Sequence, residues 1–225
     1  MAIIGLVGFI GSGKGTAADI LVKNHGYEKI SFASKVKDVA ATLFDWPRDL
    51  LEGETEESRK WREEKNEFWS EKFKQDFTPR LALQLIGTEF GRRVFSKDIW
   101  INFLESKIES NKNYVISDVR FPNEIQWIQE QGGKIIEIDK DPKPEWYKSM
   151  CNAYGNNFYK ETWILDEMQN VHQSEYLWLN EKMPAGEIWS VVIESPTETS
   201  TRAPVIFPRA SGSGFTPSKN GGLRT

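Results

Sequence analysis

The residues that point most clearly to chemistry form a glycine-rich loop near the start of the chain, Gly8-Phe9-Ile10-Gly11-Ser12-Gly13-Lys14-Gly15-Thr16. Its glycines let the backbone curl so tightly that successive N–H groups point inward, toward an anion. Lys14 adds a mobile positive charge, and a helix that begins near Thr16 adds its positive N-terminal end. We expect the phosphates of a bound nucleotide to be held by Gly11, Ser12, Gly13, Lys14, Gly15 and Thr16.

Two flanking elements must position this loop. Ile3 to Val7 is an apolar run typical of a central parallel strand, and Thr16 to Asn24 has the apolar spacing of a helix, with Gly26 placed as its C-terminal cap. This strand–loop–helix context disfavours the alternative of a glycine-rich turn that binds no ligand. The loop departs at one position from the usual phosphate-binding motif, in which Ser or Thr follows the lysine and contacts Mg²⁺. Here Gly15 follows Lys14, and Thr16 comes one residue later.

Further strand and helix signals alternate along the chain. Pro122 to Gln131 predicts a helix, with Pro at its start and Gly132 just past its end. Additional strands are predicted at Lys29–Ala33, Tyr114–Ser117, Lys134–Asp139 and Ile188–Ile193. The alternation predicts an α/β fold of the P-loop NTPase type, with a doubly wound, parallel, five-stranded sheet. Ligands of such a sheet gather beyond the carboxyl ends of its strands.

The region between the second and third strands is mostly helical and charged. Glu54 to Phe77 contains no Gly or Pro, and Trp69, Phe73 and Phe77 repeat every fourth residue, which predicts an aromatic stripe on one helix face. This aromatic stripe could stack on a base, but packing on the protein core is the preferred interpretation. Thr78-Pro79 predicts the next helix, with Thr78 as its N-cap and Pro at the first helical position.

A phosphotransferase must also hold its acceptor and neutralise charge in the transition state. We expect Asp118, which follows an apolar strand, to steer Mg²⁺ through water, and Arg120 to point toward the transferred phosphoryl. Arg92 and Arg93 are adjacent, so they cannot both face one phosphate, and Arg92 is favoured. The expected acceptor contacts are Lys37, Arg80, Gln84, Thr88, Arg92, Arg120 and Glu124. Local salt bridges or plain solvation are the alternatives for these groups.

His172 precedes Gln173-Ser174-Glu175 in a segment that suits a lid over the phosphates. A catalytic base is one interpretation of His172. A phosphate acceptor is already anionic and needs no base, so a turn followed by a helix with Ser174 as N-cap is preferred.

Composition limits the possible partners. A net charge of −4 and a pI of about 5.5 argue against an extended basic surface that binds nucleic acid. The single cysteine, Cys151, excludes an internal disulfide and suits a reducing cytoplasm. No apolar run approaches the about 18 residues of a membrane span. Residues 195–225 are rich in Ser, Thr, Pro and Gly and predict a flexible tail.

Taken in order, these motifs resemble the deoxynucleoside monophosphate kinases of tailed bacteriophages. The resemblance covers roughly residues 1–194 and is carried by the loop, Gln84–Glu89, Asp118-Val119-Arg120 and His172–Glu175. It implies transfer of the γ-phosphoryl of ATP, with Mg²⁺, to a deoxynucleoside monophosphate (dNMP), giving dNDP for phage DNA synthesis in the host cytoplasm. It also implies a helical NMP-binding region at 34–110 and a short lid near 140–180, and it is compatible with a homodimer.

Two alternatives stay open on the sequence. One is another small-molecule P-loop kinase, similar to dephospho-coenzyme A kinase, with a larger acceptor. The other is a nucleotide-binding switch or assembly factor without catalysis. Arg120 and the basic residues around Leu85–Glu89 argue against the second alternative, because a pure binder has no acceptor phosphate to neutralise.

Overall fold

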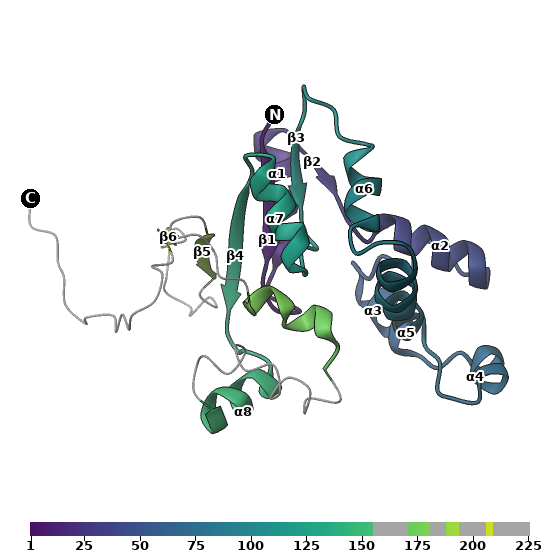
Figure 1. Ribbon diagram of the computed structural model, residues 1–225. Coiled ribbons are helices and arrows are strands. Elements are labelled where there is room, and N and C mark those ends of the chain that lie inside the picture. The colour runs from purple at the N-terminus through teal and green to yellow at the C-terminus, as the bar shows by residue number, and fades with distance from the viewer. Residues whose placement is uncertain (155–170, 181–187, 194–205, 209–225) are drawn as a thin grey trace, which may run out of the picture.

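A computed structural model describes residues 1–154, 171–180, 188–193 and 206–208 of the chain (Figure 1). Its centre is a sheet with the strand order β2-β3-β1-β4-β5-β6. Strands β1 to β5 pair in parallel, and β6 pairs with β5 in the antiparallel sense. The strands are β1 (Ile3–Val7), β2 (Tyr27–Ile30), β3 (Asn113–Ile116), β4 (Lys134–Lys140), β5 (Ile188–Ile193) and β6 (Ile206–Pro208). The predicted α/β class with a parallel sheet is confirmed.

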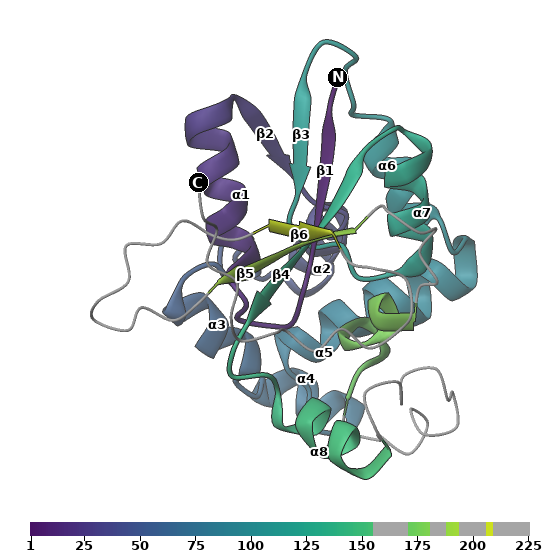
Figure 2. The same ribbon diagram turned by 90° about the vertical axis from the view of Figure 1, so that its left-hand side faces the viewer.

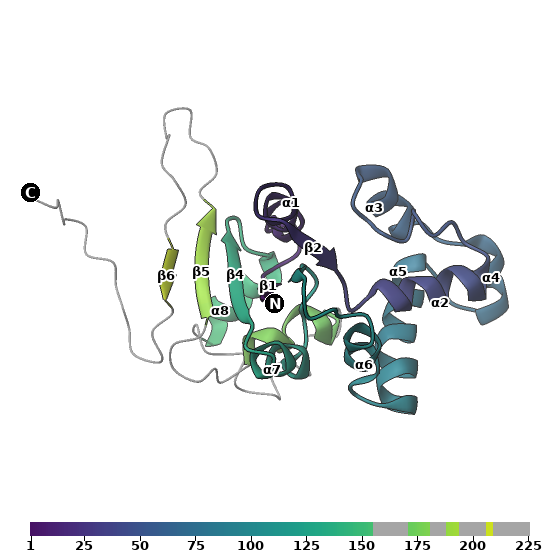
Figure 3. The same cartoon turned by 90° about the horizontal axis from the view of Figure 1, so that it is seen from above.

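Helices cover both faces of the sheet. Figure 3 shows α1 (Lys14–His25) on one face and α7 (Pro122–Glu130) on the other. Alternate residues of β1 face opposite sides, as the pleat requires. Leu6 belongs to the apolar cluster on the α1 side, and Val7 belongs to the larger cluster on the α7 side. Both faces of this central strand are therefore buried, which explains its unbroken apolar sequence.

The topology brings two loops to the same edge of the sheet. Strand β1 lies between β3 and β4 and is parallel to both, so the three strands end on the same side. The glycine-rich loop follows β1, and Asp118 and Arg120 follow β3. Ligands of open parallel sheets bind at this edge, where the chain turns in opposite directions from neighbouring strands.

The chain between β2 and β3 is helical and lies to the right of the sheet in Figure 1, and much of it lies behind and below the strands in Figure 2. It forms α2 (Ser34–Phe44), α3 (Glu56–Glu63), α4 (Glu67–Phe73), α5 (Pro79–Gln84), the π-helix η1 (Leu85–Phe95) and α6 (Ile99–Glu105). The side chain of Thr78 accepts a hydrogen bond from the Leu81 amide at 3.1 Å, and Pro79 is the first residue of α5. The predicted start of this helix is confirmed.

The aromatic stripe predicted on one helix face is broken, because the region forms two helices and Phe77 lies beyond the end of α4. Asn66 starts a second helix by accepting a hydrogen bond from the Trp69 amide, and Lys74 ends it in the left-handed conformation at a φ of 55°. The aromatic rings nevertheless pack together, with Phe73 4.8 Å from Phe77 between ring centroids, and Phe77 is buried. Packing on the core is confirmed for Phe77 and for the partly buried Trp69, whereas Phe73 is 44% exposed.

Other boundaries differ in smaller ways. Strand β2 ends at Ile30 rather than Ala33, because Ser31–Ala33 turns toward α2. The left-handed Gly26, whose N–H donates to the Leu21 carbonyl, is confirmed as the cap of α1. The predicted lid region contains α8 (Glu145–Tyr154) and the 3₁₀-helices η3 (Gln173–Glu175) and η4 (Leu177–Asn180). Residues 155–170 of that region, and all of the predicted tail except β6, lie outside the described residues. Within the described part of the chain, no helix is long and apolar enough to cross a membrane.

Candidate active site

The glycine-rich loop connects β1 directly to α1. Gly8 has a φ of 142°, and a Cβ atom at this residue would lie only 2.5 Å from the Ile138 carbonyl oxygen of β4. Gly13 adopts the left-handed conformation and caps α1, which begins at Lys14, two residues earlier than predicted. The exposed Gly15 and Thr16 therefore lie in the first helical turn, where free N–H groups and the helix dipole favour an anion.

Lys14 folds back over its own loop. Its Nζ donates hydrogen bonds to the carbonyl oxygens of Gly8 at 2.7 Å and Phe9 at 2.8 Å. Burial, together with the nearby positive charge of Arg120, lowers the pKa of Lys14 to about 8, although Glu175 and Asp118 act in the opposite direction. In the protein without ligand, the Lys14 amine therefore titrates close to physiological pH. A polyanion beside it would favour its charged form.

Asp118 joins the end of β3 to the turn before α2. Its carboxylate accepts hydrogen bonds from the Ser31 hydroxyl at 2.8 Å and from the amides of Phe32 at 3.2 Å and Ala33 at 2.9 Å. These contacts explain why β2 ends early, and they fix the start of α2 beside the glycine-rich loop. Oδ1 accepts only the Phe32 bond among the described residues, so one of its lone pairs can still accept a hydrogen bond from water.

Arg120 extends from the same strand end toward the second half of the chain. Its guanidinium donates to the Ser174 hydroxyl at 3.3 Å and forms an ion pair with Glu175 at 3.1 Å. The side chain stays partly exposed, with 39% of its surface accessible. Arg120 can therefore exchange these partners for an incoming phosphate.

Arg92 and Glu124, two of the predicted acceptor contacts, pair with each other. The Arg92 guanidinium lies 2.5 Å from the Glu124 carboxylate and stacks on the Phe121 ring at 3.9 Å. Glu124 also accepts the backbone N–H groups of Arg120 at 2.7 Å and Phe121 at 3.0 Å. Burial raises the pKa of Glu124 to about 7 against the opposing charge of Arg92. These side chains hold η1 to α7, and because their charges pair within the protein we interpret them as structural rather than as substrate contacts.

The remaining predicted acceptor contacts line the helical region. Lys37 of α2 pairs with Glu52 at 2.5 Å, and Arg80 of α5 pairs with Glu63 at 3.0 Å. Gln84 is half-buried at the end of α5, and Thr88 is buried in η1. Arg80 lies close enough to His172 for its charge to act on that ring, Lys37 lies in the first turn of α2, and Thr88 faces the protein interior.

The π-helix η1 is held in place by glycines. The Trp100 indole donates to the Gly87 carbonyl at 2.7 Å. A Cβ atom at Gly91 would lie 2.3 Å from the same indole ring. π-helical turns are rare and occur often at functional sites. Here the wider helix lets Trp100 approach the backbone closely, which explains why glycine occupies position 91.

Sequence reasoning missed two charged groups of this site. Glu175 belongs to the motif His172–Glu175, but the sequence did not predict its ion pair with Arg120. Arg62 of α3 looked like any surface arginine of a charged helix, yet it is half-buried. No local pattern distinguished either residue, because the charges that surround them come from parts of the chain that are distant in sequence.

The segment 172–175 contacts Arg120 through Ser174 and Glu175. His172 Nδ1 lies 2.9 Å from the Ser174 hydroxyl, and Ser174 lies within the 3₁₀-helix η3 rather than at the N-cap of an α-helix. Burial lowers the pKa of His172, and the charges of Glu175, Arg120, Glu89 and Arg80 also act on it. Charged residues from η1, α5, the end of β3 and η3 therefore lie close enough to His172 to act on its charge.

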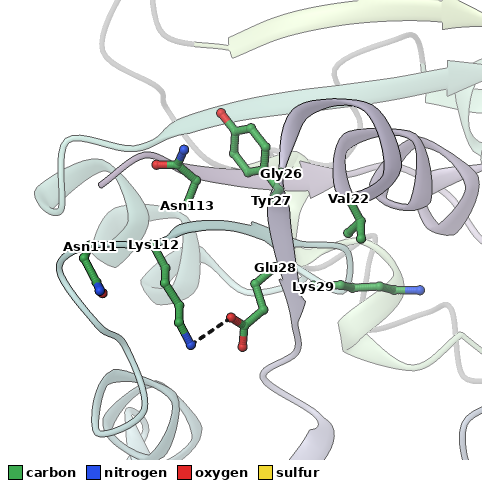
Figure 4. A pocket seen from close by; sticks show the side chains of 8 residues that line it. All are labelled: Val22, Gly26, Tyr27, Glu28, Lys29, Asn111, Lys112 and Asn113. Atoms are coloured by element: carbon green, nitrogen blue, oxygen red, sulfur yellow. Dashed lines mark ion pairs between the residues drawn. The ribbon is translucent and has the colours of Figure 1, made fainter.

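A separate hollow lies at the opposite end of the sheet (Figure 4). It is lined by the beginnings of β2 and β3, including Tyr27 and Asn113, and Lys112 pairs with Glu28 across it at 3.2 Å. The glycine-rich loop follows the end of β1, so this hollow is not part of the candidate active site.

The fold and site define a P-loop phosphotransferase: a phosphate-binding loop at the end of a parallel strand, faced by basic groups from a helical region. Residues 48–149 match the deoxynucleotide monophosphate kinase family. A protein of Acanthamoeba polyphaga mimivirus, whose predicted activity is that of a deoxynucleotide monophosphate kinase, is 34% identical over 154 residues, which are 62% of this chain and 75% of the relative. The deoxynucleoside-5'-monophosphate kinase of Escherichia phage T5 is 46% identical over 55 residues, 24% of this chain and 22% of that enzyme.

The chain therefore belongs to the deoxynucleotide monophosphate kinase family and is a kinase. Membership favours this activity over the two alternatives left open by the sequence, a kinase for a larger acceptor and a nucleotide-binding protein without catalysis.

Proposed function

We propose that the chain transfers the γ-phosphoryl of ATP to a deoxynucleoside monophosphate and releases ADP and dNDP. The observation that carries the proposal is the meeting of the loop after β1 with Arg120 after β3, on the side where the helical region supplies Lys37 and Arg80. The loop side of this site is suited to the triphosphate of the donor, and the helical side offers cations for the phosphate of the acceptor.

The donor is held by the loop. The amides of Gly11, Gly13, Gly15 and Thr16 and the hydroxyl of Ser12 surround its phosphates, and Lys14 leaves the carbonyls of Gly8 and Phe9 to contact the transferred group. Ser12 supports this role, since its hydroxyl is buried and has no hydrogen-bond partner among the described residues. A bound phosphate oxygen would satisfy it.

Mg²⁺ fits this site through water rather than through a cage of protein ligands. Asp118 retains a free acceptor position at Oδ1, and the described residues contain no cluster of three or more acidic, His or Cys side chains. Mg²⁺ commonly binds with few carboxylates, several waters and the substrate phosphates. When bound, the ion neutralises charge on the β- and γ-phosphates.

The acceptor lies between the loop and the helical region. Arg120 releases Glu175 and spreads the negative charge that develops during in-line transfer, while Lys37 and Arg80 orient the acceptor phosphate. The acceptor oxygen is already anionic, so no base is required, and His172 serves to position Ser174. In this proposal residues 1–194 form the kinase domain, and the region near 140–180 closes over the phosphates.

A coupled assay tests the proposed function. Purified protein is mixed with ATP, Mg²⁺ and each common dNMP and NMP, and ADP release is followed. We expect turnover that depends on both ATP and a dNMP. ADP release without an acceptor, or turnover with none of the monophosphates, would contradict the proposal.

A further inference from the structure

Arg62 on α3 is a half-buried arginine whose Nε is sealed from solvent and has no hydrogen-bond partner in the described part of the chain. The adjacent carboxylate, Glu63, pairs with Arg80 at 3.0 Å instead. Leaving a buried charged donor without a partner is costly, and such a group in a folded protein calls for an explanation. A ligand that binds there would supply one.

The backbone makes room for this guanidinium. A Cβ atom at Gly53 would lie 2.1 Å from Cζ and Nη2 of Arg62, far inside van der Waals contact. Gly53 also has a φ of 69°, a conformation that favours glycine. The loop before α3 therefore fixes the Arg62 side chain by close packing, and within the described part of the chain its charge forms no ion pair.

Positive charge accumulates around Arg62. Burial lowers its pKa, and the charges of Arg80, Arg120 and Arg59 act in the same direction, opposed by Glu63. Arg62, Arg80 and Arg120 come from α3, α5 and the end of β3, three elements that meet only in the folded chain. Like charges held together in a partly dry site destabilise the free protein, and an anion bound among them removes that cost.

We propose that Arg62 is the anchor for the phosphate of the acceptor and that Gly53 holds its guanidinium in place. This inference rests on the proposed function and extends it to a residue outside the expected acceptor contacts. The planar guanidinium presents paired donors that match two oxygens of a phosphate monoester, and it binds a dianion better than a neutral nucleoside. The donor triphosphate is held separately by the loop around Lys14.

The first experiment compares Arg62→Met and Arg62→Lys with Arg59→Met. Arg59 is an exposed arginine of the same helix and controls for loss of one positive charge. We expect Arg62→Met to raise the KM for dNMP about 30-fold or more, the range for losing one partner of a buried charge contact. The KM for ATP should change less than about 2-fold in all three variants. Arg62→Lys should recover only part of the loss, because lysine lacks the paired donors.

A second variant separates binding from folding. Gly53→Ala keeps Arg62 but places a methyl group where its guanidinium lies. We expect it to raise the KM for dNMP in the same way, while ATP still raises the Tm as in the wild type. If Arg62→Met does not fold, Gly53→Ala and Arg62→Lys test the proposal instead, through the KM for dNMP and the ATP-induced rise in Tm.

The dNMP-induced rise in Tm tests the anchor without turnover, so it can fail independently of the kinase activity. Wild-type protein that responds to dNMP but transfers no phosphoryl would contradict the proposed function and leave the anchor to be judged by binding. If the dNMP-induced rise in Tm of both Arg62→Met and Gly53→Ala stays within about 2-fold of the wild-type rise, the proposed role of Arg62 is wrong.

Discussion

At the scale of single residues, the site consists of cations that are held by exchangeable partners. Lys14 donates to two loop carbonyls, and Arg120 pairs with Glu175 while a large part of its side chain stays exposed. Both contacts use oxygen atoms that a phosphate can replace. The free protein therefore keeps these two charges in position without committing them to permanent ion pairs.

Replacing either charge should abolish most of the activity. We expect Lys14→Ala and Arg120→Ala each to lower kcat by about 100-fold or more, as for other fixed charges that stabilise a transition state. Steady-state kinetics with ATP and a dNMP measures the effect, with Lys23→Ala on the exposed end of α1 as control. Near-normal turnover of a variant would remove that residue from the mechanism.

The lowered pKa of Lys14 predicts that ATP binding takes up protons. The free amine titrates near pH 8, and the triphosphate favours its charged form, so affinity for ATP should fall as pH rises above about 8. Near pH 8 we expect uptake of about half a proton per ATP bound, and almost none at pH 6.5. Calorimetry in buffers of different ionisation enthalpy gives the number directly. Uptake that persists in Lys14→Met would assign the proton to another group.

At the scale of elements, one buried ion pair orients the helix after β3. Glu124 closes the first turn of α7 by accepting two backbone N–H groups, and its other oxygen binds Arg92 of η1. One of those two N–H groups belongs to Arg120, so the pair also fixes the backbone from which that side chain extends. Arg92 and Glu124 thus position a site residue through the fold.

This role predicts a loss of stability rather than a loss of substrate affinity. Arg92→Met leaves the Glu124 carboxylate buried without its cation and should lower the free energy of unfolding by about 3 kcal/mol. Urea titration of Arg92→Met, Glu124→Gln and the double variant measures the coupling of the two side chains. The KM for dNMP of folded Arg92→Met should stay within about 3-fold of the wild type. A large KM change with unaltered stability would restore Arg92 as an acceptor contact.

At the scale of the whole molecule, aromatic rings connect the phosphate loop to the later part of the chain. Phe9, inside the loop, packs against Trp146 of α8 at 5.8 Å and Trp178 of η4 at 5.3 Å between ring centroids. It also contacts Tyr147 at 4.8 Å. The conformation of the loop is thereby tied to segments that lie more than a hundred residues away in the sequence.

Removing this ring should weaken the loop as well as the fold. Phe9→Ala creates a cavity among these rings and is expected to cost about 3 kcal/mol of stability. The KM for ATP should rise more than the KM for dNMP, because the ring supports the donor side of the site. Phe9→Leu, which fills most of the volume, serves as the conservative comparison for both thermal unfolding and kinetics. Equal changes in the two KM values would mean that the ring stabilises the fold without shaping the loop.

The sequence by itself determined the features that depend on neighbouring residues. Strand β1, the glycine-rich loop, the left-handed cap at Gly26 and the Thr78-Pro79 start of α5 were all predicted and are present. Hydrogen bonding within one turn and the burial of a continuous apolar run are local effects, so a few adjacent residues suffice to specify them.

Only the tertiary structure decided which charges pair and which stay available. Arg92 and Glu124 are 32 residues apart, and Arg120 and Glu175 are 55 apart, so no local pattern could reveal either ion pair. Arg62 differs from the exposed Arg59 of the same helix because the folded chain packs it against Gly53 and brings the charges of Arg80 and Arg120 near it. The role of a charged side chain depends on its partners and its burial, and both are set by how the helices pack on the sheet.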